Sequence, residues 1–170
     1  MKRSLVTALA LLALFALPVD ALAGKVSLPK DMDGIKVKFD DAKKIDSGTI
    51  HEGDTLAISL AEDIKIGGIS IVETGAKGIA IATKVVKASR PGKPGSIEIT
   101  FVDLNPKGSY RSADGGKIKL AGVVSDKGGG RKILSYLFIL GLFIKGGQGE
   151  IDTAKVHTAK IGEKIVLESR

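Results

Sequence analysis

The stretch GIAIATKVVKASRPGKPGSIEITFVDL, residues 78–104, contains two of the longest alternating runs in the chain. In residues 78–87 and again in 96–104, apolar side chains recur at every second position, which is the period of a β-strand with one buried face. Between the runs stands RPGKPG, residues 90–95, whose two prolines and two glycines favour a turn. The stretch therefore predicts a β-hairpin with residues 90–95 at its tip.

The rest of the chain repeats this pattern in shorter runs. Apolar residues two apart occur in VKF, DTLAISLAE, ISIVE, KIKLAGVV, KVHTAKI and KIVLE, which begin at residues 37, 54, 69, 117, 155 and 164. Glycine-containing turn signals separate the runs at intervals of roughly 8 to 15 residues, as is typical of β-sandwiches and barrels. The sequence predicts an all-β fold, a single small barrel or sandwich of short antiparallel strands, with at most one short helix near 133–144.

The N-terminal segment has the features of a signal peptide. It begins with two basic residues, continues through an apolar core from Leu5 to Leu17, and reaches Ala21-Leu22-Ala23, the small-x-small form that signal peptidase accepts. We expect cleavage after Ala23, which leaves residues 24–170 as a single β domain. The chain has no cysteine. We therefore expect neither a lipoprotein anchor nor disulfides, and a periplasmic or cell-surface location.

The charge of the chain is moderately basic, with 26 Lys and Arg against 19 Asp and Glu. Residues 24–170 retain 24 basic and 18 acidic residues, a net charge of +6. An exported basic protein meets anionic lipids and acidic polymers before it meets nucleic acid. We therefore expect an envelope protein or an anionic envelope polymer or lipid surface as partner, and no nucleic acid. The locally concentrated cations, which flank the RPGKPG turn, are Lys84, Lys87, Arg90 and Lys93.

Those four cations have two interpretations. They either steer an anionic partner weakly toward the hairpin tip, or they belong, like the other lysines, to the solvated outer faces of strands.

The segment ILSYLFILGLFI, residues 133–144, carries no charge. As a helix its twelve residues span about 18 Å, well short of the roughly 30 Å hydrocarbon core of a bilayer, so a simple spanning helix is excluded. The segment is either a buried strand or short helix of the core, or an apolar loop between Arg131-Lys132 and Lys145 that makes peripheral contact with a membrane or partner. In the second case the candidate binding residues are Leu137, Phe138, Leu142 and Phe143.

Catalytic and metal-binding patterns are sparse. The two histidines are His51, in the turn IHEGD, and His157, whose parity with Lys155 predicts an outward-facing side chain. Ser47 lies near His51 in sequence, but no Ser-His-Asp order of familiar spacing accompanies it. A weak divalent-metal site would require the fold to bring both histidines together with Glu52 or Asp54, which leaves too few ligands for structural zinc. We therefore expect no catalytic residue, metal or cofactor.

A wider pattern surrounds these residues. The run SGTIHEGDTLAISLAEDIKIGGISIVETGAKGIAIATKV, residues 47–85, combines Gly-Asp, an alternating strand, the acidic pair Glu62-Asp63, a β step to glycine, and Gly75-Ala76 before a further strand. It resembles exported bacterial β-rich envelope proteins of uncharacterised activity. FIKGGQGEIDTAKVHTAKI, residues 143–161, is similar to their closing segment but departs from it at Thr153-Ala154, where Gly-Thr is expected. The resemblance implies export and a β fold, and it implies no particular activity.

Two functional hypotheses follow. The first is a non-enzymatic exported envelope β module that binds or assembles with another cell-envelope component. The alternative is an envelope-acting hydrolase or metal-assisted enzyme that uses acidic loop residues and a histidine. The first is favoured because catalysis requires ionisable groups clustered in a pocket, and this sequence has few candidates for such a cluster.

Overall fold

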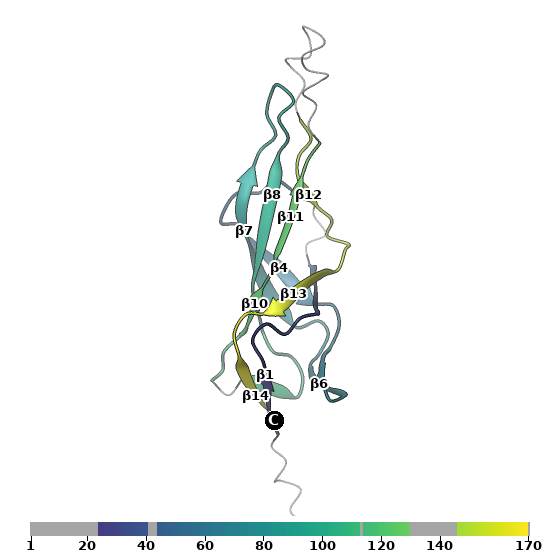
Figure 1. Cartoon of the computed structure of the whole chain (residues 1–170), viewed down its shortest axis with the longest axis vertical. Helices are drawn as coiled ribbons and strands as arrows, with labels where there is room; N and C mark the ends of the chain where they lie inside the picture. Colours follow the sequence, from purple (N-terminus) through teal and green to yellow (C-terminus); the bar gives the residue numbers. More distant parts are fainter. Residues whose placement is uncertain (1–23, 41–43, 113, 130–145, 170) are drawn as a thin grey trace, which may run out of the picture.

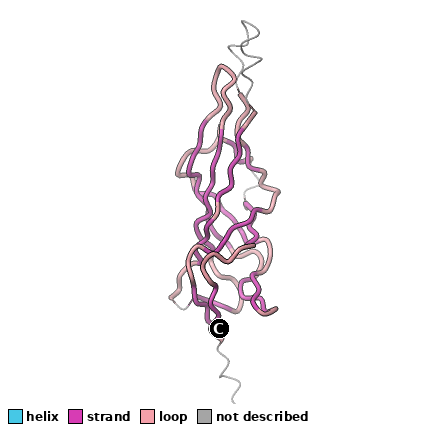
Figure 2. Tube along the Cα trace, viewed as in Figure 1, coloured by secondary structure: helices cyan, strands magenta, loops and turns pink. Residues whose placement is uncertain are grey.

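The computed structural model describes residues 24–40, 44–112, 114–129 and 146–169 (Figure 1). Within these ranges the chain forms strands and loops and no helix (Figure 2). The predicted all-β fold class is therefore confirmed. The short helix considered near 133–144 lies outside the described residues.

The strands follow the predicted runs and add several short ones between them. Their bounds are β1 Lys25–Leu28, β2 Ile35–Phe39, β3 Ile45–Asp46, β4 Thr55–Leu60, β5 Ile64–Ile66, β6 Ile69–Val72, β7 Lys77–Val86, β8 Ser96–Leu104, β9 Tyr110–Ser112, β10 Ile118–Ala121, β11 Val123–Lys127, β12 Glu150–Ile151, β13 His157–Ile161 and β14 Ile165–Ser169.

Six of these strands close into an antiparallel barrel. Around the ring, each strand pairs with the next in the order β10, β13, β2, β4, β7, β8. The ring closes where β8 also pairs with β10, with Ile118 opposite Leu104. Within the ring, closure leaves no free sheet edge, and the buried side chains of these strands form one core.

A bend at Gly122 separates β10 from β11, which the sequence predicted as one run. Gly122 has φ of 147°, a conformation that favours glycine. A Cβ at this position would also lie only 3.2 Å from Cδ2 of the Phe101 ring. Before the bend the chain pairs with both β8 and β13, whereas after it β11 pairs with β8 alone. The strands β7, β8 and β11 therefore continue past the closed ring toward the upper end of Figure 1.

The core is filled by alternating residues of the barrel strands. In β8, the side chains of Ile97, Ile99 and Phe101 are buried while those between them are partly exposed. Burial of each such side chain contributes about 1.5–3 kcal/mol. The remaining strands form three small sheets, β1–β14–β9, β5–β6 and β12–β3. The first two lie at the end of the elongated molecule opposite the β7–β8 tip (Figure 1).

The β5–β6 hairpin is held at its base by the carboxylate of Asp63. Thr74 donates to Asp63 Oδ1 from its hydroxyl at 2.7 Å and from its backbone N–H at 2.8 Å, and the Ser70 hydroxyl donates to Oδ2 at 3.0 Å. The Thr74 hydroxyl, followed by the Thr74 N–H and the Ser70 hydroxyl, lowers the pKa of Asp63 from 3.8 to about 2. The ionised carboxylate is therefore the form that the folded hairpin prefers.

This pKa predicts how stability depends on pH. Because the folded pKa lies below the unfolded value of 3.8, the contribution of Asp63 is fully present above about pH 4 and is lost as the pH falls toward about 2. We expect the Asp63→Asn variant to lose less thermal stability than the unmodified chain between pH 5 and pH 2, measured as Tm by circular dichroism. Every other titratable group is the same in the two proteins, so the difference between their pH profiles isolates Asp63. Parallel pH profiles for the two proteins would contradict this assignment.

Candidate binding site at the basic end of the barrel

The tip of the β7–β8 hairpin lies where the sequence predicted it. Ser89 and Lys93 exchange two backbone hydrogen bonds, of 3.1 and 2.9 Å, which narrow the loop between the strands. The side chains of all four candidate cations are exposed: Lys84, Lys87, Arg90 and Lys93. The structure thus places these residues along one hairpin, and their binding role stays a prediction.

Two further chain segments lie against this tip. Gly95 donates its N–H to Gly147 O at 2.9 Å and accepts a hydrogen bond from Gly128 N at 2.9 Å, while Gly147 N donates to Gly129 O at 2.9 Å. Residues 127–129 and 146–148 are therefore fixed beside the hairpin loop. We call residues 87–95, 127–129 and 146–148 together the basic tip.

The basic tip brings in a cation that the sequence analysis did not select, Lys127, which is also exposed. With Lys87, Arg90 and Lys93 it makes four cations, and the residues of the basic tip include no carboxylate. The four apolar candidates of the sequence analysis, Leu137, Phe138, Leu142 and Phe143, lie outside the described residues.

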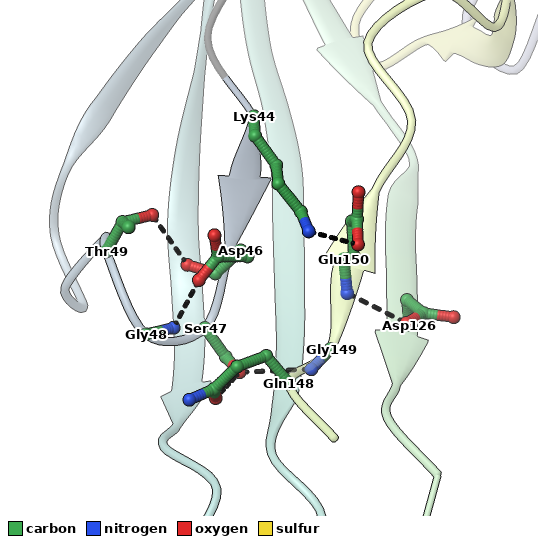
Figure 3. Close-up of polar contacts among 9 residues, drawn as sticks. All are labelled: Lys44, Asp46, Ser47, Gly48, Thr49, Asp126, Gln148, Gly149 and Glu150. Atoms are coloured by element: carbon green, nitrogen blue, oxygen red, sulfur yellow. Dashed lines mark hydrogen bonds and ion pairs between the residues drawn. The ribbon is translucent and has the colours of Figure 1, made fainter.

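A partly buried polar cluster, with Ser47 and Gln148 at its centre, joins the segments of the basic tip (Figure 3). The hydroxyl of Ser47, which is fully buried, donates to Gln148 Oε1 at 2.7 Å and accepts from Gly149 N at 3.1 Å. The same Gln148 oxygen also accepts from Ala88 N at 2.9 Å. Gln148 thus accepts hydrogen bonds both from Ser47, which follows β3, and from Ala88 in the β7–β8 hairpin. We call this arrangement the Ser47–Gln148 clamp.

Acidic residues beside the clamp bind backbone groups and a lysine. Asp126 Oδ2 accepts from Glu150 N at 2.8 Å, and Asp46 Oδ1 accepts from Gly48 N at 2.8 Å (Figure 3). Glu150 forms an ion pair with Lys44 at 2.7 Å, and its hydrogen bond raises the pKa of the Lys44 ammonium. These contacts connect β3, β11 and β12 and fix the position of the clamp.

Lys84 stands apart from the other candidate cations. The register places it opposite Glu98, which in turn lies opposite Ser125. These residues line an open groove of about 290 Å³ across the outer face of β7, β8 and β11, together with Ser96, Ile97, Asp126 and Lys127. Glu98 and Asp126 lie in this groove with Lys84 and Lys127, so its charge is mixed, although the residues of the basic tip themselves include no carboxylate.

The two histidines lie far apart. His51 lies in the turn before Thr55, with its Nε2 3.3 Å from Lys87 Nζ. His157 lies opposite Val37, which lies opposite Leu60, and Leu60 is five residues along β4 from Thr55, a distance of about 16 Å. The histidines therefore do not form the shared metal site that the sequence analysis considered. In the described part of the chain, no group of three or more His, Asp or Glu side chains is arranged to hold a metal ion.

The predicted outward orientation of His157 is wrong. His157 shares the strand face of Ala159 and Ile161, which are buried, and its ring packs edge-on against Phe39 with 5.4 Å between centroids. The error arises because Lys155 precedes the strand, so its parity does not extend into β13. Ser47 is likewise no partner of His51, because its hydroxyl is bonded to Gln148 and Gly149.

Comparison with known proteins gives no relative: no family model, no curated protein and no solved structure matches this chain. Over 24–40, 44–112, 114–129 and 146–169, no helix is long and apolar enough to cross a membrane.

Proposed function

We propose that this chain is a non-enzymatic exported β module that binds another component of the bacterial cell envelope through its basic tip. The observation that carries the proposal is the gathering of three chain segments at one end of the barrel, with exposed cations and no carboxylate among them. Such a patch attracts an anionic partner and orients it before contact.

The Ser47–Gln148 clamp supports the same proposal. A binding surface assembled from loops needs a rigid base, because fixing mobile side chains and loops on binding costs affinity. Here the loops are joined to one another by backbone hydrogen bonds, and Gln148 joins the hairpin at Ala88 N to the buried hydroxyl of Ser47, which follows β3. The N-terminal segment, with its signal-peptide pattern, supports export and therefore an envelope partner.

Site-specific photocrosslinking in intact cells tests this function. A photoreactive residue at Lys93, in the basic tip, should give adducts with an envelope component, whereas the same residue at Lys164, which precedes β14 at the other end of the molecule, should give few. Gel shifts identify protein adducts, and intact-mass spectrometry identifies lipid adducts. Equal adduct yields at the two positions, or none at Lys93, would overturn the proposed function.

A further inference from the structure

Positive charge is distributed unevenly along the molecule. Residues 24–170 carry a net charge of +6. The basic tip accounts for +4 of it, and residues 130–145, which join two segments of the tip in sequence, contribute another +3 through Arg131, Lys132 and Lys145. All other residues from 24 to 170 together carry −1. The positive excess therefore lies in the basic tip and in residues 130–145, which connect residue 129 to residue 146 in the sequence.

The geometry of this end favours a broad surface over a small ligand. The cations come from the hairpin loop and from the end of β11, and all are exposed. The β7–β8 loop lies at the end of the long axis of the molecule, while Lys87 and Lys127 lie at the base of this loop, where β7 and β11 end (Figure 1). An end with cations on separate segments can contact several anionic groups at once, as a layer of headgroups presents them.

The composition of residues 130–145, which connect two segments of the basic tip in sequence, favours a lipid surface over other anionic partners. Residues 133–144 carry no charge and stand between basic residues. Cations beside an apolar run are the composition of membrane-surface segments, in which electrostatic attraction and apolar burial add.

We propose that the basic tip docks end-on onto a bilayer that contains anionic phospholipid, with Lys87, Lys93 and Lys127 as the principal contacts. This inference rests on the proposed function and names its partner. In this orientation the long axis of the molecule points away from the bilayer. The sheets β1–β14–β9 and β5–β6 then lie at the end of the molecule farthest from the bilayer (Figure 1).

Vesicle cosedimentation tests the proposal. The full chain, purified as a bacterial host processes it, is mixed with phosphatidylglycerol-containing vesicles or with phosphatidylcholine vesicles. We expect binding to the anionic vesicles, little to the neutral ones, and loss of binding as salt approaches 1 M, where the screening length falls to about 3 Å. The triple variant Lys87→Gln, Lys93→Gln, Lys127→Gln should bind on the order of 100-fold more weakly, about fivefold for each cation.

A matched variant separates position from net charge. Lys30→Gln, Lys119→Gln and Lys164→Gln remove the same charge from exposed positions beside or within β1, β10 and β14, in the lower half of Figure 1. We expect this variant to bind within about threefold of the unmodified chain, because these sites lie more than a Debye length of about 10 Å from the bilayer. Unchanged circular dichroism for both variants shows that the fold is retained.

Three results would overturn the lipid inference: equal weakening by the two triple variants, equal binding to neutral and anionic vesicles, or binding to soluble polyglutamate with none to vesicles. Protein adducts at Lys93 without vesicle binding would overturn the lipid inference and leave the proposed function standing. The absence of any adduct at Lys93 would overturn both.

Discussion

Replacing Phe101 with alanine should lower the free energy of unfolding by about 3–5 kcal/mol. The Phe101 side chain is only 1% exposed and lies in β8, the strand that pairs with β7, β10 and β11. Its ring centroid is 6.2 Å from that of Phe39 on β2, so it bridges two strands that are not neighbours in the ring. Truncation would leave a cavity in the centre of the barrel. Equilibrium denaturant unfolding measures the loss as a lower transition midpoint at unchanged slope.

The control for this substitution is Val123→Ala on the adjacent strand β11. Val123 is 56% exposed, so its truncation should change stability by no more than about 0.5 kcal/mol. A loss below about 1 kcal/mol for Phe101→Ala would mean that the ring is not enclosed by the barrel.

The longer strands could be predicted from the sequence because one of their faces is buried. In β8 the apolar positions alternate with polar ones, which is a direct record of core and solvent. The strands β3 and β12 could not be predicted in this way, because each has two residues and exists through pairing with the other. The break at Gly122 was also missed, since the apolar alternation of KIKLAGVV continues across it and the bend reflects the proximity of Phe101 and β13.

The candidate site could be predicted only where its residues are neighbours in sequence. The cations of the hairpin loop, Lys87, Arg90 and Lys93, lie within seven residues of one another, so their clustering is visible in the chain. Lys127 and Gln148 reach the same end through the fold; Gln148 bonds to Ser47 across 101 residues. The available signal was the pair of glycine clusters, 128–130 and 146–147, because repeated glycine marks close approach of backbones.

The substitution Gly95→Ala should destabilise the protein by about 3 kcal/mol, more than an ordinary loop substitution. A Cβ at residue 95 would collide with the Ser47 hydroxyl and would lie 2.7 Å from Gln148 Oε1 and 2.8 Å from Val86 O. Overpacking of this kind costs about 1–3 kcal/mol. Moving Ser47 would also disturb the hydrogen bonds of its buried hydroxyl with Gln148 and Gly149, and an unpaired buried polar group costs about 1–3 kcal/mol. Denaturant unfolding measures the combined effect.

Gly129→Ala is the matched control, because Gly129 belongs to the same basic tip but a Cβ there meets no atom within 4 Å. Its stability should change by less than about 0.5 kcal/mol. If Gly95→Ala lowered the free energy of unfolding no more than Gly129→Ala does, the Ser47–Gln148 clamp would accommodate the added Cβ without strain. The clamp could then not be the rigid base of the basic tip. If Gly95→Ala is destabilising as expected, vesicle binding measured below its unfolding transition should also weaken although no cation has been removed, because the clamp positions the segments that carry Lys93 and Lys127.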